Sequence, residues 1–261
     1  PEFMFDLGAV YYERKEYDLA LKYYELAESS GSIWAWNGLG YIWYYGRTGT
    51  ADYEKAFRYF SKVKDYTGEK INEFTRIEAS FKIADMYKNG YYVEKNEEKY
   101  IEIIEDLYKD IQKSQRWLPV AEVYTRLASI RAKQGKDDEA IDLYFDARED
   151  LINRLAYNRF FGDINRINWL VNDLYELIEF DPTDFDLYDL FYILKEEHLV
   201  SFKYKRKTHE IESRRSEEGE MNVRFDDKWY RNITDMFIRQ DLDGESIEHE
   251  YANLNDWRLI R

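Results

Sequence analysis

The sequence predicts a mainly α fold: a solenoid of about four helix–turn–helix repeats with a closing helical hairpin, followed by a small α+β appendage that contains a β-hairpin. Three observations lead to this prediction. Pairs of an apolar and a small residue recur in the first 150 residues, the apolar residues there are spaced as on a helix face, and the spacing changes to two after residue 198. With 25 Tyr, 15 Phe and 7 Trp in 261 residues, the chain has enough aromatic side chains to build a core.

The recurring pairs mark one position in each repeat. Leu39-Gly40, Ile83-Ala84 and Leu127-Ala128 are 44 residues apart, and Leu7-Gly8 lies 32 residues before the first of them. A cluster that shares one helix face follows each pair: Ala20, Tyr24 and Ala27; Ala56, Phe60 and Val63; Tyr100, Ile104 and Leu107; Ala140, Tyr144 and Ala147. We expect the small residues to let two antiparallel helices approach, and the aromatic residues to fill the space between successive units.

Glycines mark the ends of the first helices, since Gly adopts the left-handed conformation of a helix C-cap. They lie in Gly46-Arg47-Thr48-Gly49, Lys88-Asn89-Gly90 and Gln134-Gly135-Lys136. With these turns, residues 121–147 resemble a tetratricopeptide unit, and residues 38–56, with their longer turn, resemble the Sel-one-like subclass. The resemblance covers roughly residues 5–155 and departs from the usual pattern at Tyr100 and Arg131. It implies a scaffold for protein–protein contacts with no catalytic activity of its own.

The domain order that we expect is a cloning scar at 1–3, repeats at 4–158, closing helices at 159–198 and the appendage at 199–261. Apolar residues from Ile164 to Ile178 keep a helical spacing, Pro182 interrupts it, and a second helix is expected at 185–197. The runs 200–204 and 221–225 alternate as strands of a hairpin with a charged tip at 210–220. Two short helices are expected at 229–237 and 247–257, around a turn at 241–244.

The charge and the absence of cysteine exclude several functions. The formal net charge of −15 makes nucleic-acid binding unlikely, and acidic neighbours balance the one basic run, Lys203 to Lys207 with Arg214 and Arg215. Without Cys there are no disulfides, thiolate nucleophiles or Cys-ligated zinc sites. No segment has the length and apolarity of a membrane span or a signal sequence, so a cytoplasmic protein is expected.

Residues for catalysis or metal binding are few. The three His (His198, His209 and His249) have no chelating spacing, and no glycine-rich phosphate loop occurs. The segment 239–250 resembles an EF-hand loop, but Arg239 stands where the first oxygen ligand is needed, which favours a plain Gly turn. The carboxylates are expected on a solvated surface. We therefore expect no metal, no cofactor and no enzyme activity.

The aromatic residues of the first helices predict a contact site. In related solenoids these positions line the inner groove, and exposed Trp and Tyr are enriched in contact sites. The predicted groove residues are Trp34, Asn37, Tyr41, Tyr44, Tyr45, Phe81, Asp85, Lys88, Ser129 and Lys133. We expect Tyr44 to be exposed and Trp43 to be buried. The alternative is that the additional tyrosines only enlarge the core.

Three functions are compatible with these features. The first is a non-enzymatic adaptor whose groove binds a peptide or a protein, with the acidic surface favouring a basic partner. The second is an acidic immunity or inhibitor protein that blocks an enzyme or a nucleic-acid-binding protein. The third, an enzyme with its site in the appendage, is the weakest, because His209 and His249 have no partner that the sequence identifies.

Overall fold

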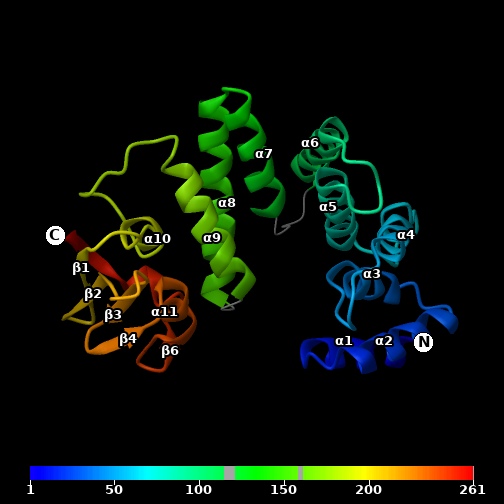
Figure 1. Ribbon diagram of the computed structural model, residues 1–261, viewed down its shortest axis with the longest axis horizontal. Coiled ribbons are helices and arrows are strands. Elements are labelled where there is room, and N and C mark those ends of the chain that lie inside the picture. The colour runs from blue at the N-terminus through cyan, green and yellow to red at the C-terminus, as the bar shows by residue number, and fades with distance from the viewer. Residues whose placement is uncertain (115–120, 158–160, 261) are drawn as a thin grey trace. The chain divides into compact units, whose positions relative to one another are not determined.

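The computed structural model describes residues 1–114, 121–157 and 161–260, and the chain divides into two compact units, Pro1–Leu118 (unit 1) and Pro119–Arg261 (unit 2). Unit 1 contains three helix–turn–helix pairs (Figure 1). Unit 2 contains the fourth pair, one further long helix and a small sheet. The four predicted repeats are therefore present, and the third and fourth lie in different units. The boundary predicted at 158 falls outside the described residues.

Each pair in unit 1 consists of two helices joined by a short turn. The bounds are α1 (Glu2–Glu13) and α2 (Tyr17–Ser29), α3 (Ala35–Tyr45) and α4 (Tyr53–Lys64), α5 (Glu73–Asn89) and α6 (Glu97–Lys113). The predicted glycine caps are confirmed for α3 and α5, where Gly46 and Gly90 adopt left-handed φ values of 58° and 72°. The next helix then starts with a polar cap: the Asp52 side chain accepts a hydrogen bond from the Lys55 backbone N–H.

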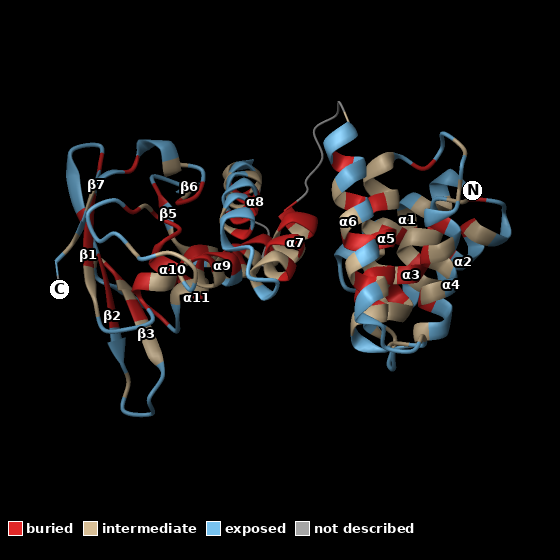
Figure 2. Ribbon diagram, turned by 90° about the horizontal axis from the view of Figure 1, so that it is seen from above, coloured by how far each residue is buried: buried red, intermediate tan, exposed pale blue. Residues whose placement is uncertain are grey.

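Because glycine has no side chain, glycines in unit 1 let aromatic rings pack between the helices. The Tyr24 ring on α2 lies against Gly8 of α1 and Gly38 of α3, and a Cβ atom at either glycine would approach the ring within 2.5–2.6 Å. Gly40 of α3 and the ring of Phe60 on α4 meet in the same way. The four predicted clusters, from Ala20–Tyr24–Ala27 to Ala140–Tyr144–Ala147, are buried as expected. Figure 2 shows buried residues on the helix faces that meet inside unit 1.

The helices of unit 2 begin with the fourth pair, α7 (Ala121–Lys133) and α8 (Asp137–Tyr157), followed by α9 (Phe161–Leu174) and the single turn α10 (Leu190–Ile193). The second arm of the predicted closing hairpin, residues 185–197, is thus mostly not helical, and this expectation was wrong. The helix stops after one turn because the chain passes into a strand that begins at Leu199. Before that turn, aspartate side chains bind backbone N–H groups as at a helix N-terminus. Asp186 accepts from Tyr188 N–H, and Asp189 accepts from Asp186 N–H.

The five-stranded antiparallel sheet of unit 2 has the order β4-β3-β2-β1-β7. Its strands are β1 (Leu199–Tyr204), β2 (Lys207–Arg215), β3 (Met221–Phe225), β4 (Lys228–Tyr230) and β7 (Asn255–Leu259). The predicted strands are β1 and β3, but they do not pair with each other. The segment expected as a charged tip supplies β2 between them, and Glu212 is buried there because Arg214 and Arg224 pair with it at 2.9 Å.

The last 35 residues contain less helix than expected. Residues 229–237 are divided between β4 and α11 (Ile233–Arg239), and 247–257 contain only the 3-10 turn η1 (Tyr251–Asn253) and the start of β7. The turn at 241–244 joins the two-residue strands β5 (Asp241–Leu242) and β6 (Glu245–Ser246) rather than two helices. Asp243 and Gly244 have φ values of 54° and 92°, which suits the tight turn of a hairpin.

Candidate interaction site

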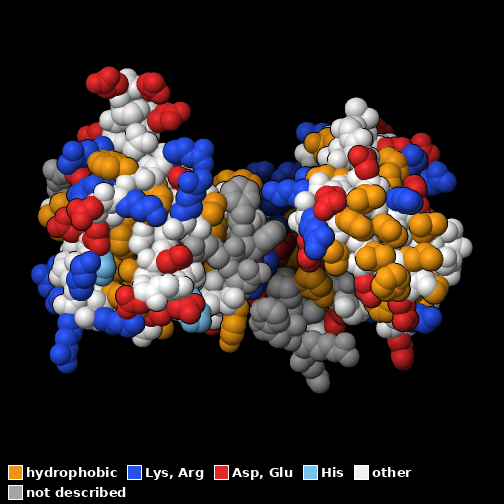
Figure 3. Space-filling view, turned by 90° about the horizontal axis from the view of Figure 1, so that it is seen from below, with side chains coloured by type: hydrophobic (Ala, Val, Ile, Leu, Met, Phe, Trp, Pro, Cys, Tyr) orange, Lys and Arg blue, Asp and Glu red, His pale blue; other side chains and the backbone are white. Residues whose placement is uncertain are grey.

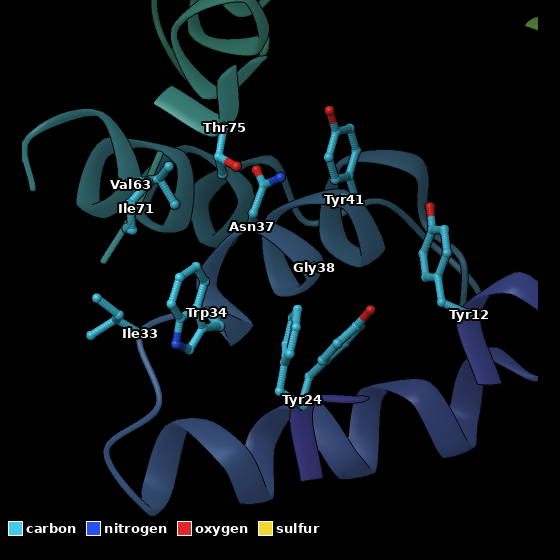
Figure 4. A pocket seen from close by; sticks show the side chains of 11 residues that line it. Tyr12, Tyr24, Ile33, Trp34, Asn37, Gly38, Tyr41, Val63, Ile71 and Thr75 are labelled. Atoms are coloured by element: carbon cyan, nitrogen blue, oxygen red, sulfur yellow. The ribbon is translucent and has the colours of Figure 1, made fainter. Parts of the chain in front are cut away.

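A pocket of about 210 Å³ opens in unit 1 where α1, α2, α3 and the start of α5 meet (Figure 4). All the side chains that line it are uncharged: Phe5, Tyr12, Tyr24, Ile33, Trp34, Asn37, Tyr41, Val63, Ile71 and Thr75, with Gly38 at the wall. Trp34 is 38% exposed. The pocket therefore presents five aromatic rings and has room for roughly one large side chain.

The pocket wall also carries an unmatched acceptor. The Asn37 Oδ1 atom is buried without a hydrogen-bond partner among the described residues. Asn37, Thr75 and Tyr41 all line the pocket (Figure 4). An unmatched buried acceptor costs free energy, which a guest with an N–H or O–H group would recover if the amide turns toward it.

Next to the pocket lies a group of three rings, Tyr41, Tyr44 and Tyr45, which we name the tyrosine cluster. Tyr41 and Tyr45 are stacked at 6.1 Å, and Tyr44 meets Tyr45 edge to face at 5.0 Å. The Lys82 Nζ atom from α5 donates a hydrogen bond to the Tyr45 hydroxyl group at 2.7 Å and lies 5.0 Å from the centres of the Tyr44 and Tyr45 rings. Tyr41 belongs to both the cluster and the pocket, so the two features form one continuous surface.

The guanidinium group of Arg47 completes this surface. It lies 4.7 Å from the centre of the Tyr45 ring and 5.2 Å from that of Tyr17, and its Nε–H donates to the Tyr12 hydroxyl group at 3.4 Å. Burial raises the pKa of the Tyr12 hydroxyl group, and the hydrogen bond and charge of Arg47 lower it by a smaller amount. Arg47 is exposed, and three aromatic side chains hold it beside the pocket.

The structure places the predicted groove residues in three environments. Trp34, Asn37 and Tyr41 line the pocket, while Tyr44 and Tyr45 form the adjoining cluster. Phe81, Asp85 and Lys88 lie on α5; the first two are buried, and the Lys88 Nζ atom lies 5.1 Å from the centre of the Tyr100 ring. Ser129 and Lys133 lie on α7, in unit 2, with Ser129 half-buried and Lys133 exposed.

Tyr44 and Trp43 differ from their expected exposures. Tyr44 is not freely exposed, because its ring also contacts Tyr53, Phe60 and Tyr91 at 5.9–6.2 Å. Burial, and then the nearby Asp85 carboxylate, raise the pKa of the Tyr44 hydroxyl group. Trp43 is only half-buried, and the Lys55 Nζ atom lies 3.9 Å from its ring centre. Both rings therefore combine packing with partial exposure.

Sequence reasoning missed several residues of this surface. Tyr12 and Tyr24 come from the preceding pair of helices, Arg47 was read only as a turn residue, and Lys82 was not singled out. A partial signal existed for Lys82, which lies three residues before the predicted groove residue Asp85 and so on the same face of the helix. No spacing rule places Arg47 over Tyr45, since that contact depends on the path of the turn after α3.

A second apolar surface covers the outside of the first helix pair. Val10 on α1 and Leu19 and Leu26 on α2 are 38–42% exposed. Figure 3 shows this face of unit 1, where hydrophobic side chains gather and charged ones lie mostly around the edge. Exposed apolar side chains of unit 1 thus lie on α1 and α2 as well as at the pocket.

Unit 2 contains two largely buried ionic networks. Arg154 pairs with Glu122, Asp150 and Asp163 at 2.6–3.4 Å, and Arg166 joins Glu122 and Asp163. In a second network Arg148 binds Asp186 at 2.7 Å and Asp189 at 3.2 Å, and the Tyr175 and Tyr251 hydroxyl groups complete it. The expectation that the carboxylates are solvated was wrong for these residues. Their partners explain the burial, because each shares a guanidinium group.

The structure also supplies the partner of His209 that the sequence did not identify. Its Nδ1 atom lies 2.8 Å from Asp226 Oδ2, and its ring stacks on Phe202 at 5.3 Å. Within residues 1–114, 121–157 and 161–260, no three His, Asp or Glu side chains are arranged to hold a metal ion. Of the basic run, Lys203, Lys205 and Lys207 pair with Asp256, Asp243 and Asp226, respectively.

Comparisons with known proteins reveal similarity in fold. No family model matches the sequence, and no curated protein matches it. Among solved structures, a Sel1 repeat protein from Oxalobacter formigenes is similar, with a TM-score of 0.50 and 19% sequence identity. The match covers 69% of this chain and 65% of that protein, so the chain spans less than two thirds of its length. None of the helices in the described part of the chain has the length and apolarity to cross a membrane. The resemblance predicted from the sequence is thus confirmed at the level of the fold: this chain has a helical repeat fold of the Sel1 type.

Proposed function

We propose that this chain is a non-enzymatic interaction scaffold, and that unit 1 binds a segment of a protein or peptide partner through the pocket and the tyrosine cluster. The carrying observation is the pocket itself: five aromatic rings and an unmatched Asn37 acceptor surround about 210 Å³ beside an exposed arginine. Exposed aromatic residues around an apolar pocket are typical of the centres of protein interfaces. The repeat fold is compatible with this role, because stacked repeats present extended binding surfaces.

The distribution of charge divides the proposed role between the two units. Unit 1 has 17 basic and 21 acidic side chains, a net charge of −4, whereas unit 2 has 21 basic and 32 acidic side chains, a net charge of −11. The preference for a basic partner that the sequence suggested therefore belongs mainly to unit 2, through long-range attraction. The chemistry of the partner's contacts at the pocket is set separately, by the side chains that line the pocket.

Selection from a displayed library of random dodecapeptides tests the proposal on the full chain. Two tryptophan variants form a matched pair: Trp34→Ala removes the pocket edge, and Trp229→Ala removes a ring of similar exposure from β4 in unit 2. We expect the wild type and Trp229→Ala to enrich a shared set of sequences, and Trp34→Ala to lose it. Synthetic copies should bind the wild type at least tenfold more tightly than Trp34→Ala. Equal enrichment with all three proteins would refute the pocket as the binding site.

A further inference from the structure

The pocket alone selects for shape and apolarity. Because all its lining side chains are uncharged, a charged group inserted into it would lose water without gaining an ion partner. The volume of about 210 Å³ and the aromatic walls suit one bulky apolar side chain. The part of a guest that lies inside the pocket is therefore neutral.

The side of the pocket formed by Tyr12 and Tyr41 has the opposite character. Arg47 is held there against Tyr12, Tyr17 and Tyr45, and of its five N–H groups only Nε–H makes a hydrogen bond within the described residues. It forms no ion pair with a described carboxylate. Four N–H groups of a guanidinium that is already oriented thus remain available, in the planar arrangement that binds a carboxylate with two hydrogen bonds.

The acidic residues of this region do not occupy Arg47. Asp85 is buried near Tyr44, and Glu78 acts on Tyr41, whose pKa is raised first by burial and then by that carboxylate. Lys82 adds a second positive charge, which its hydrogen bond to the Tyr45 hydroxyl group keeps at the cluster. Glu13 is exposed and acts on Tyr24, but it makes no ion pair with Arg47 among the described residues. The exposed charge in direct contact with the Tyr12 hydroxyl group is that of Arg47.

From this arrangement we propose that the partner segment combines a bulky apolar side chain, which enters the pocket, with a neighbouring carboxylate, which binds Arg47. The inference rests on the proposed function and names the chemistry of the partner. It differs from the expectation based on the total charge of the chain, because it assigns an acidic contact to a local cation in unit 1. The apolar group supplies the burial, and the carboxylate supplies orientation and selectivity.

Three small probes with one skeleton test the proposal: 4-phenylbutanoate, 4-phenylbutan-1-ol and 4-phenylbutylammonium. Their dissociation constants are measured with the full chain from chemical-shift changes in two-dimensional NMR spectra at low ionic strength. We expect the carboxylate to bind about fivefold more tightly than the alcohol, and the ammonium compound to bind most weakly. Arg47→Gln should weaken carboxylate binding to the level of the alcohol and leave alcohol binding unchanged. Arg58→Gln, at an exposed arginine of α4 that pairs with Glu54, is the control and should change neither.

Each outcome separates this inference from the proposed function. Equal binding of the three probes, or tighter binding of the alcohol or the ammonium compound, overturns the acidic contact and leaves the pocket as a binding site. Carboxylate binding that survives in Arg47→Gln also overturns it, since another cation would then be responsible. If no probe binds, or if Trp34→Ala binds all three as the wild type does, both the acidic contact and the pocket are refuted.

Discussion

Replacing Gly40 with alanine tests the contact that brings α3 and α4 together. A Cβ atom at this position would lie 2.6 Å from Phe60 Cε1 and 2.8 Å from Cδ1, which is closer than carbon atoms can approach. The Phe60 ring is fully buried and meets the rings of Tyr41 and Tyr44 at 5.5 and 6.1 Å. Because it cannot move without displacing both, we expect the added methyl group to strain the core.

The magnitude follows from two opposing effects. In the middle of an unhindered helix, Gly→Ala stabilises by about 1 kcal/mol. Overpacking of a core costs about 1–3 kcal/mol, so Gly40→Ala should lower the free energy of unfolding by about 1 kcal/mol. Phe60→Leu should cost about 1–2 kcal/mol through lost apolar burial. In the double variant the methyl group fills part of the vacated space. The loss of stability in the double variant should therefore be at least about 1 kcal/mol smaller than the sum of the losses in the two single variants.

Scanning calorimetry of the full chain measures these differences. A loss of about 1 kcal/mol lowers the Tm of a unit of this size by about 4 °C. The four proteins of the cycle are compared by the transition that Phe60→Leu shifts, which identifies the melting of unit 1. Two results would refute the reasoning: a Tm that rises in Gly40→Ala, or losses in the double variant that are additive within about 0.4 kcal/mol.

Two further predictions concern the rings of Tyr44 and Trp43 and the carboxylate of Glu122. Tyr44→Ala should cost about 2–3 kcal/mol of stability, and its melting temperature should be no higher than that of Trp43→Ala, because Tyr44 contacts more rings. A melting temperature of Tyr44→Ala close to that of the wild type would contradict the role of Tyr44 in packing. For Glu122, burial favours the neutral form, but Arg166 and Arg154 outweigh it and the net pKa is lowered. A lowered pKa adds stability above the unfolded pKa of about 4.3, and this contribution is lost as the pH falls through the folded value. Melting curves of Glu122→Gln should therefore show a deficit of about 2 kcal/mol at pH 7 that shrinks below about pH 4, and an equal deficit at pH 7 and pH 3 would contradict this.

The repeat architecture could be predicted from the sequence because its contacts are local and periodic. Gly8 and Tyr24, or Gly40 and Phe60, lie within 20 residues of each other on the two helices of one pair, and the spacing within each helix places its apolar and small residues on one face. The caps were equally local: Gly46 ends α3 because only a residue that tolerates positive φ suits that position. For the candidate site, the same periodicity identified Trp34 and Tyr41 on one face of α3.

What the local sequence could not determine was which elements meet across long stretches of chain. β7 is a strand because it pairs with β1 more than 50 residues earlier, and 247–257 carries no local sign of this pairing. The charged segment around Glu212 is a strand because Arg224 compensates the buried carboxylate. Likewise, the pocket exists because Tyr12 and Tyr24 reach α3 from the preceding helix pair. Periodicity records only which residues of one element share a face, whereas burial, ion pairing and the position of Arg47 depend on partners that the folded chain brings together.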